Sequence, residues 1–191
     1  VRILQRGGAD PAAAPGKPAP NKPTPGPAAD EQEMKLTYVS FQKFMRASSL
    51  TNTADFWESV RVLNLPCDDP HREIDLDAML ATELPTGAMY MRCNHLKVLS
   101  HQKPAGKSYQ EMEAHGQVWV QAREFEAQSD HMTYNEAKDQ IIFTGEGNNL
   151  AVLSKIPFVG AKPDVFKAKK ITYIRSTGEA KADRVGSFEG N

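Results

Sequence analysis

Hydrophobic and polar side chains alternate along much of the chain. In residues 111–121 the even-numbered positions are apolar or small and the odd-numbered ones carry charged or amide side chains, with Trp119 as the exception. A period of two residues is typical of a half-buried β-strand, whereas an amphipathic helix repeats every 3.6 residues. The pattern therefore predicts a strand with one face toward an apolar interior. The run from Ala54 to Val62 behaves similarly, although Glu58 interrupts it.

Short runs of this kind continue to the C-terminal end. They cover residues 88–99, 124–134, 140–145, 150–154, 164–174 and 179–188. Turn-rich stretches such as Pro85-Thr86-Gly87 and Gly145–Asn149 separate them. Strands at this spacing without intervening amphipathic helices indicate an all-β, antiparallel sandwich, jelly roll or barrel. One segment, residues 71–84, is compatible with a helical turn or with a strand over 74–78, and we favour the strand.

The first part of the chain has a different composition. Residues 10–29 consist mainly of Pro, Ala, Gly and Lys and contain no large apolar side chain. Such a segment cannot bury enough surface to offset its ordering entropy, and repeated prolines favour an extended spacer. We therefore expect residues 1–33 to form a mostly disordered linker or tether and residues 34–191 to form the folded domain. A motif for a proline-binding groove is the alternative to a plain linker.

Charge and cysteine content narrow the possible functions. The formal net charge of −1 argues against a large nucleic-acid interface, and no apolar stretch is long enough to predict a transmembrane helix. Because the chain begins with Val1, we expect a fragment or a processed product. The cysteines are Cys67 and Cys93. They could form a disulfide in an oxidising compartment or remain two separate thiols, and we favour separate thiols.

A strand–turn–strand unit recurs in the second half of the chain. Met132-Thr133-Tyr134 and Ile171-Thr172-Tyr173 each follow a Phe-x-Ala triplet, Phe125–Ala127 and Phe166–Ala168 respectively. A polar turn and a new strand come after each tyrosine. Repetition of one such unit suggests stacked hairpins that share an apolar interior. Small residues among the large ones would allow either tight packing or room for a guest molecule.

These motifs, in this order, resemble the OstA/LptA-like domains of lipopolysaccharide transport. The stretch Ala114–Val120 fits the Ala-x-Gly-x-Val-x-Val strand of that family, and Phe125–Gly145 fits the strands that follow it. Phe166–Gly190 is similar to the start of a further copy. Residues 34–100 fit loosely: Trp57–Val62 stands where another such strand is expected, with Ser59 in place of the glycine.

The resemblance implies a folded-over β-sheet, a jelly roll open along one side, in the bacterial periplasm, either as a soluble bridge or tethered to a membrane. It implies a non-enzymatic module without cofactors, whose apolar groove shields the acyl chains of lipopolysaccharide or a similar glycolipid. Its edge strands would pair with other OstA-like domains by β-strand addition. The interior-facing residues expected to contact lipid are Met112, Ala114, Val118, Val120, Phe125, Ala127, Met132, Tyr134, Ile141, Phe143, Phe166, Ala168, Ile171 and Tyr173.

Two other function classes stay open: a structural or adhesion module of the cell envelope with a dry core, and an enzyme acting on envelope carbohydrate. The enzyme hypothesis depends on Trp and Asp residues alone, and the sequence shows no convincing set of catalytic residues. Asp75 and Asp77 alternate with apolar residues, as on the solvent face of a strand. Trp57 and Trp119 fit the opposite sheet surface or a contact with a partner or sugar.

Further polar residues are candidates for binding a metal ion or lipid phosphates. Cys67, His71, Cys93 and His95 could be combined into a zinc site, but their spacing is not that of a zinc finger, and we predict no metal. His115 and His131 fall on faces opposite the apolar residues and are expected at the surface. A basic cluster, Lys167, Lys169, Lys170 and Arg175, fits lipid phosphates at a cavity mouth or a charged protective edge.

Overall fold

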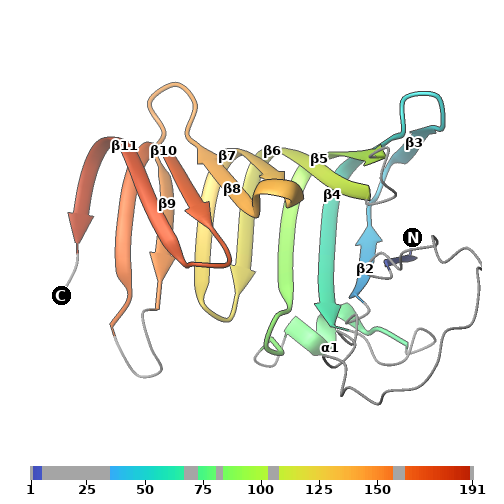
Figure 1. The fold of residues 1–191 in the computed structure, drawn as a ribbon, viewed down its shortest axis with the longest axis horizontal. Coiled ribbons are helices and arrows are strands. Elements are labelled where there is room, and N and C mark those ends of the chain that lie inside the picture. The colour runs from blue at the N-terminus through green and yellow to red at the C-terminus, as the bar shows by residue number, and fades with distance from the viewer. Residues whose placement is uncertain are drawn as a thin grey trace, which may run out of the picture.

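The computed structural model describes residues 2–5, 35–66, 73–80, 84–102, 108–156 and 162–189. These residues form an antiparallel sheet of 11 strands with a short helix and one 3-10 turn (Figure 1). The strands are β1 Arg2–Gln5, β2 Lys35–Ser40, β3 Phe44–Ser48, β4 Thr53–Pro66, β5 Met89–Gln102, β6 Ser108–Ala122, β7 Phe125–Asn135, β8 Gln140–Thr144, β9 Ala151–Lys155, β10 Asp164–Ile174 and β11 Glu179–Glu189. The helix α1 spans Leu76–Leu80, and the 3-10 turn η1 spans Glu136–Lys138. The predicted all-β, antiparallel class is confirmed.

The strands follow each other across the sheet almost in chain order. The path runs β1-β2-β4-β5-β6-β7-β8-β10-β11, while β3 lies beside β4, and β9 lies beside β7 and β10. Consecutive strands joined by short turns are therefore neighbours in the sheet, which is the stacked-hairpin arrangement that the repeated motifs predict. β11 forms one end of this path and β1 the other.

The long strands bend, so that the sheet folds over on itself. The bend is visible at the top of Figure 1, where β11 and its neighbours arch. The register shifts after Trp57 in β4, after Arg92 in β5 and after His115 in β6, at the same level of the sheet. Each shift is a β-bulge, which leaves residues unpaired and bends the strand. We call this line of bulges the crease. It divides the long strands into two halves, and these halves pack face to face.

Left-handed backbone conformations mark the crease. Gly116 has φ +76°, and a Cβ there would lie 2.8 Å from Nδ2 of Asn94 on the neighbouring strand, so the position requires glycine. Gln117 beside it also has a positive φ, 51°. In β4 the corresponding pair is Glu58 and Ser59, with φ 67° and 48°. The register thus places Glu58, not Ser59, where β6 has its glycine, which corrects the sequence alignment by one residue.

Between β8 and β9 the chain breaks at the crease instead of bulging. Residues 145–150 loop out there, so that β8 pairs with one half of β10 and β9 with the other. Asp130, at the register shift of β7, accepts hydrogen bonds from the backbone N–H of Glu146 at 2.7 Å and from Nδ2 of Asn149 at 3.1 Å. The Lys169 ammonium donates to carbonyl oxygens of the loop, that of Asn149 at 2.8 Å. The neighbouring strands therefore fix the loop.

The main apolar core lies between the two halves of the sheet. It combines residues from both halves of β4 to β10, and its largest side chains, such as Phe56, Met91 and Phe143, are fully buried. A second cluster lies on the outer face of β2, β4 and β5 beneath α1. Its buried members are Leu36, Leu63, Leu65, Leu76, Leu84, Ala88 and Tyr90. β4 is consequently buried on both faces at Val62 and Leu63.

The preference for a strand over residues 74–78 is wrong, because Leu76–Leu80 form α1. The Asp75 carboxylate accepts a hydrogen bond from the backbone N–H of Ala78 at 3.0 Å. This is the contact of a helix N-cap, and the helix lays its apolar side chains on the second cluster. Asp75 and Asp77 are therefore helix-start residues and not the polar face of a strand. The described residues include no helix that is long and apolar enough to cross a membrane.

The N-terminal edge of the sheet comes from an unexpected place. Residues 2–5, within the segment predicted as a tether, form β1 and pair antiparallel with β2, with Leu4 opposite Leu36. Most of the predicted tether lies outside the described residues. The two interpretations of its proline-rich part, a plain linker or a motif for a proline-binding groove, concern those residues and stay predictions. The domain boundary at residue 34 stays a prediction.

Cys93 is a free, buried thiol in the main core. Burial raises the pKa of this thiol from 9.0 to about 12, because the apolar surroundings disfavour the thiolate, while a backbone hydrogen bond at His95 acts weakly in the opposite direction. The free thiol agrees with the favoured interpretation of two separate cysteines. Cys67 lies outside the described residues.

Candidate functional site

The structure brings the expected interior residues together on one surface. Most of them are buried in the main core, and Met112, Tyr134 and Phe166 are partly buried and pack against it. The buried members are Ala114, Val118, Val120, Phe125, Ala127, Met132, Ile141, Phe143, Ala168, Ile171 and Tyr173. The alternation in the sequence therefore identifies the inner face correctly. Whether these residues contact a lipid stays a prediction.

A groove lies between the two halves of the sheet, toward β2, β4, β5 and β6. Its lining residues are Thr37, Val39, Phe56, Val62, Asn64, Met89, Met91, Leu96, Val98, Gln110, Met112, Tyr134, Glu136 and Arg175. The cavity volume is about 60 Å³, which is space for only about four water molecules. Three of the lining side chains are methionines, which adapt their shape readily. Most of this wall, from β2, β4 and β5, is absent from the predicted set.

The rim of the groove carries the polar groups. Arg175 donates a hydrogen bond from Nη1 to the hydroxyl of Tyr134 at 3.2 Å, and its guanidinium lies 5.7 Å from the centre of that ring. Burial raises the pKa of Tyr134, an effect that the Arg175 charge partly opposes. Met89, Tyr134, Glu136 and Arg175 also line a second depression, so that the two hollows meet at this rim. The groove is thus bordered at this rim by the Arg175 guanidinium and the Glu136 carboxylate.

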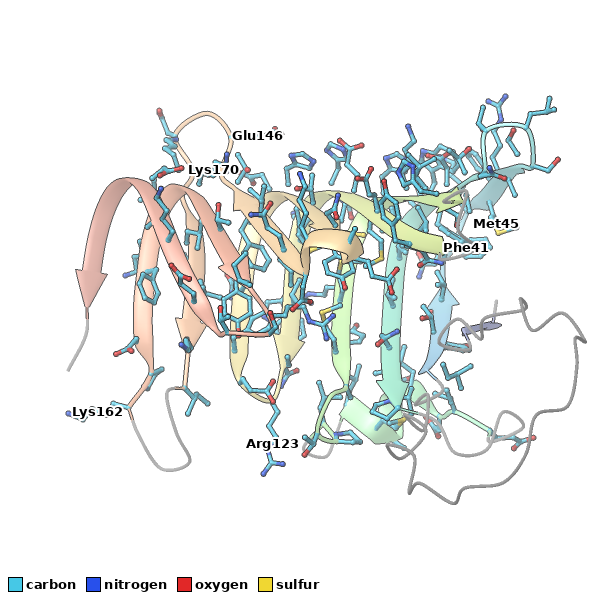
Figure 2. All side chains as sticks on the ribbon, in the orientation of Figure 1. Phe41, Met45, Arg123, Glu146, Lys162 and Lys170 are labelled. Carbon is cyan, nitrogen blue, oxygen red and sulfur yellow. The ribbon has the colours of Figure 1, made fainter. Side chains whose placement is uncertain are left out.

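The basic cluster predicted for a cavity mouth is divided by the fold. Arg175 alone among its members lies at the rim of the groove. The Lys169 ammonium donates hydrogen bonds to the loop at the crease. Lys170 is exposed and lies at the same upper edge as Glu146, as Figure 2 shows. Lys167 and Ala168 are neighbours on β10, and Ala168 faces the core, so Lys167 faces outward. The lysines therefore belong to the outer surface.

The two tryptophans lie on the outer surface of the sheet. Trp57 stacks between Phe44 and His95, and Trp119 contacts Tyr90 beside the second cluster. Nε1 of Trp119 donates a hydrogen bond to Glu126 at 2.7 Å. Both side chains thus pack on the face opposite the groove.

A zinc site that combines Cys67, His71, Cys93 and His95 does not form among the residues that the structure describes. Cys93 faces the main core, whereas His95 stacks with Trp57 on the outer face, so these two side chains point away from each other. Cys67 and His71 lie outside the described residues. His115 and His131 lie on the outer face as expected, and they meet there in a cluster that the sequence reasoning missed.

Comparison with known proteins identifies the family. The sequence profile described as "LptA/(LptD N-terminal domain) LPS transport protein" matches residues 84–179, about half of the 191-residue chain. The chain belongs to this family. The match begins before β5 and ends at the start of β11, so it includes the crease of β5, β6 and β7, the first repeated unit, and β10 of the second. No curated protein sequence matches the chain significantly.

A solved structure supports the fold independently. LptH from Pseudomonas aeruginosa is described as the LptA-homologous periplasmic component of the lipopolysaccharide transport device. It matches this chain with a TM-score of 0.50 at 11% sequence identity, over 78% of this chain and 82% of LptH. At this identity the likeness concerns the fold alone. The folded-over jelly roll expected from the sequence motifs is confirmed.

Proposed function

We propose that this chain is a non-enzymatic periplasmic module that shields the acyl chains of lipopolysaccharide, or of a similar glycolipid, between the two halves of its sheet. The observation that carries the proposal is the apolar groove, which lies inside a fold whose family is one of lipopolysaccharide transport. Most of its lining residues on β4, β5 and β6 are apolar, with Asn64 and Gln110 as polar exceptions. Apolar walls with few polar groups are the usual composition of lipid and ligand sites.

The narrow cavity constrains the mechanism. The groove of about 60 Å³ adjoins a depression of about 510 Å³ at the Arg175 rim, and an acyl chain fits the narrow part only if the two halves move apart or the lining methionines change rotamer. Met89, Met91 and Met112 lie on β5 and β6, on both sides of the crease. Arg175 at the rim is placed to meet a phosphate group of the glycolipid with a charge-assisted hydrogen bond.

Edge pairing forms the second part of the proposal. β11 is the C-terminal end of the strand path, and its outer side has no partner strand among the described residues. A strand of a related domain could extend the sheet there by backbone hydrogen bonds. Consecutive modules would then align their grooves into a longer apolar path.

The same narrow cavity favours a second candidate, a structural module with a dry core. Site-specific photo-crosslinking separates the two. A photoreactive residue at Met112, on the groove wall, should give a light-dependent adduct with lipopolysaccharide. The matched control is Thr133 on β7, whose neighbours in the chain, Met132 and Tyr134, face the core while Thr133 lines a depression on the outer face. Thr133 should give none.

The result against lipid binding is equally defined. If correctly folded variants carrying the probe at Met112 and at Val118 both give no adduct with lipopolysaccharide, the dry-core module is the better account. Val118 provides an independent interior position, since it is buried in the main core beyond the crease of β6.

A further inference from the structure

The outer face of the sheet carries a row of stacked rings along the crease. Phe44, Trp57, His95, His115 and His131 come one each from β3, β4, β5, β6 and β7. Successive ring centroids are separated by 4.5, 4.8, 5.9 and 4.3 Å. The row lies on the face opposite the lipid groove, so the proposed function does not use it.

At the end of this row two imidazoles share one carboxylate. Nε2 of His115 lies 3.1 Å from Oε1 of Glu113, and Nε2 of His131 lies 3.3 Å from the same oxygen. The two rings are stacked with an angle of 11° between their planes. One potential ligand atom from each of the three residues lies within 4.8 Å of the other two.

The strand pairing fixes this geometry. Glu113 and His115 are two residues apart on β6 and share a face, and His131 is directly opposite His115 on β7. Two ligands at 2.0–2.1 Å from a tetrahedral ion are about 3.3 Å apart, which follows from the bond lengths typical of zinc. The two nitrogen–oxygen distances are close to this value. The two imidazole planes are nearly parallel, so at least one ring must turn to direct its Nε2 lone pair at a shared ion.

His131 also has an unsatisfied nitrogen. Its Nε2 is buried and, within the described part of the chain, forms no hydrogen bond, although the Glu113 oxygen lies at 3.3 Å, because the geometry is unsuitable. Buried polar atoms almost always have a partner, since leaving one unpaired costs free energy. A metal ion in front of Nε2 would supply that partner.

His95 differs from His115 and His131 because it has a carboxylate partner other than Glu113. Its Nε2 lies 3.2 Å from Oδ1 of Asp55, so it already has a carboxylate of its own. Lys97 is opposite Glu113 in the register of β5 and β6. The potential ligands are accordingly Glu113, His115 and His131, and His95 completes the stack beside them.

We propose that Glu113, His115 and His131 form a binding site for a divalent transition-metal ion of the zinc class. Two imidazoles and one carboxylate suit Zn²⁺ better than Ca²⁺ or Mg²⁺, which prefer oxygen ligands. The three side chains are 44%, 41% and 23% exposed, and a water molecule would complete the coordination of a four-coordinate ion. The bound ion clamps β6 to β7 at the crease.

The test is titration of the metal-free, full-length chain with Zn²⁺ by calorimetry. We expect one ion per chain, and at least about a tenfold loss of affinity in each of Glu113→Gln, His115→Asn and His131→Asn. The matched control is His101→Asn, because Nε2 of His101 lies 3.0 Å from Oε2 of Glu111 but no second histidine joins that pair. This variant should bind Zn²⁺ like the unsubstituted chain.

Two further measurements do not depend on how the variants fold. Co²⁺ bound to the unsubstituted chain should give the intense visible absorption of four-coordinate cobalt, and a hundredfold excess of Zn²⁺ over Kd should raise Tm by roughly 5 °C. The proposal is overturned if the unsubstituted chain binds no stoichiometric Zn²⁺. It is equally overturned if Glu113→Gln and His131→Asn, folded by circular dichroism, retain full affinity.

Discussion

Single residues at the crease determine whether the sheet can fold over. Gly116 combines a left-handed backbone with close approach to Asn94, two demands that only glycine meets together. Glu58 occupies the equivalent position in β4 with φ 67°, so the crease there carries a strained side-chain-bearing residue. The glycine of the family motif is thus explained by curvature and not by contact with a ligand.

Gly116→Ala should destabilise the domain by about 2–3 kcal/mol, since the new Cβ adds a clash with Asn94 to the cost of the left-handed backbone. Gly147→Ala is the control: φ there is +52° and nothing lies within 4 Å of a Cβ, so about 1 kcal/mol is expected from the backbone alone. Urea denaturation of both variants measures the difference. If both variants lose the same unfolding free energy, the close approach of Gly116 to Asn94 does not contribute to the effect on stability.

Cys93 should make stability depend on pH in the alkaline range. The folded thiol has a pKa of about 12 against 9.0 for an ordinary thiol, so between these values only the unfolded state ionises. The stabilising contribution is complete below pH 9 and is lost as pH rises toward 12. In a Cys67→Ala background, the difference in unfolding free energy between the parent and Cys93→Ala should therefore shrink from pH 8.5 upward. A difference independent of pH would place the thiol in a solvated environment.

The inner-face residues are predictable because each half-strand alternates by itself, although the bulges can exchange odd and even positions. In β6 the buried positions Ala114 and Val118 are both even, whereas in β7 burial passes from Ala127 to Met132. The histidine cluster is less accessible to sequence reasoning. In β6 and β7 Val120 is opposite Ala127, and continuing this register without a bulge would place His115 opposite Met132. The bulge moves His131 into that place instead. The one available signal was Glu113 and His115, two residues apart on a polar face.

At the scale of elements, the strands follow from apolar alternation and turn residues, and α1 does not. Residues 74–78, where α1 begins, alternate apolar and acidic side chains, which fits a strand equally well. The helix forms because Asp75 caps it and because the outer face of β2 and β4 offers Leu36, Leu63 and Leu65 for burial. That second apolar surface is a tertiary feature, since it appears only when these strands are paired.

Asp75→Ala should cost about 1 kcal/mol of unfolding free energy, because the backbone N–H of Ala78 loses its side-chain acceptor. Asp77→Ala is the matched control in the same helix. Asp77 pairs with Arg61 at 3.0 Å, but its side chain is 84% exposed, so its removal should change stability by less than about 0.5 kcal/mol. Thermal denaturation of the two variants ranks them, and a larger loss from Asp77→Ala would contradict the capping role.

At the scale of the whole molecule, the two sheet edges are unequal. The C-terminal edge is β11, an 11-residue strand, whereas the N-terminal edge is the four-residue β1, which lies on the longer β2 (Figure 1). A short outer strand is one way in which proteins protect an edge from association. Composition could not reveal this, because β1 precedes the proline-rich segment in the chain and reaches β2 only through the fold. β1 therefore occupies the edge that another domain would need for pairing.

Displacing β1 should promote head-to-tail association. The double substitution Ile3→Pro and Leu4→Pro removes two consecutive backbone N–H groups, and because these point to opposite sides of a strand, one of them faces β2. The freed edge of β2 can then accept β11 of a second copy by strand addition. Sedimentation velocity should show a mass that rises with concentration in this variant, whereas Ala12→Pro, within the already proline-rich segment, should behave like the parent chain. If the double variant stays folded and monomeric at every concentration while the parent associates, β1 is itself the pairing strand and not its cover.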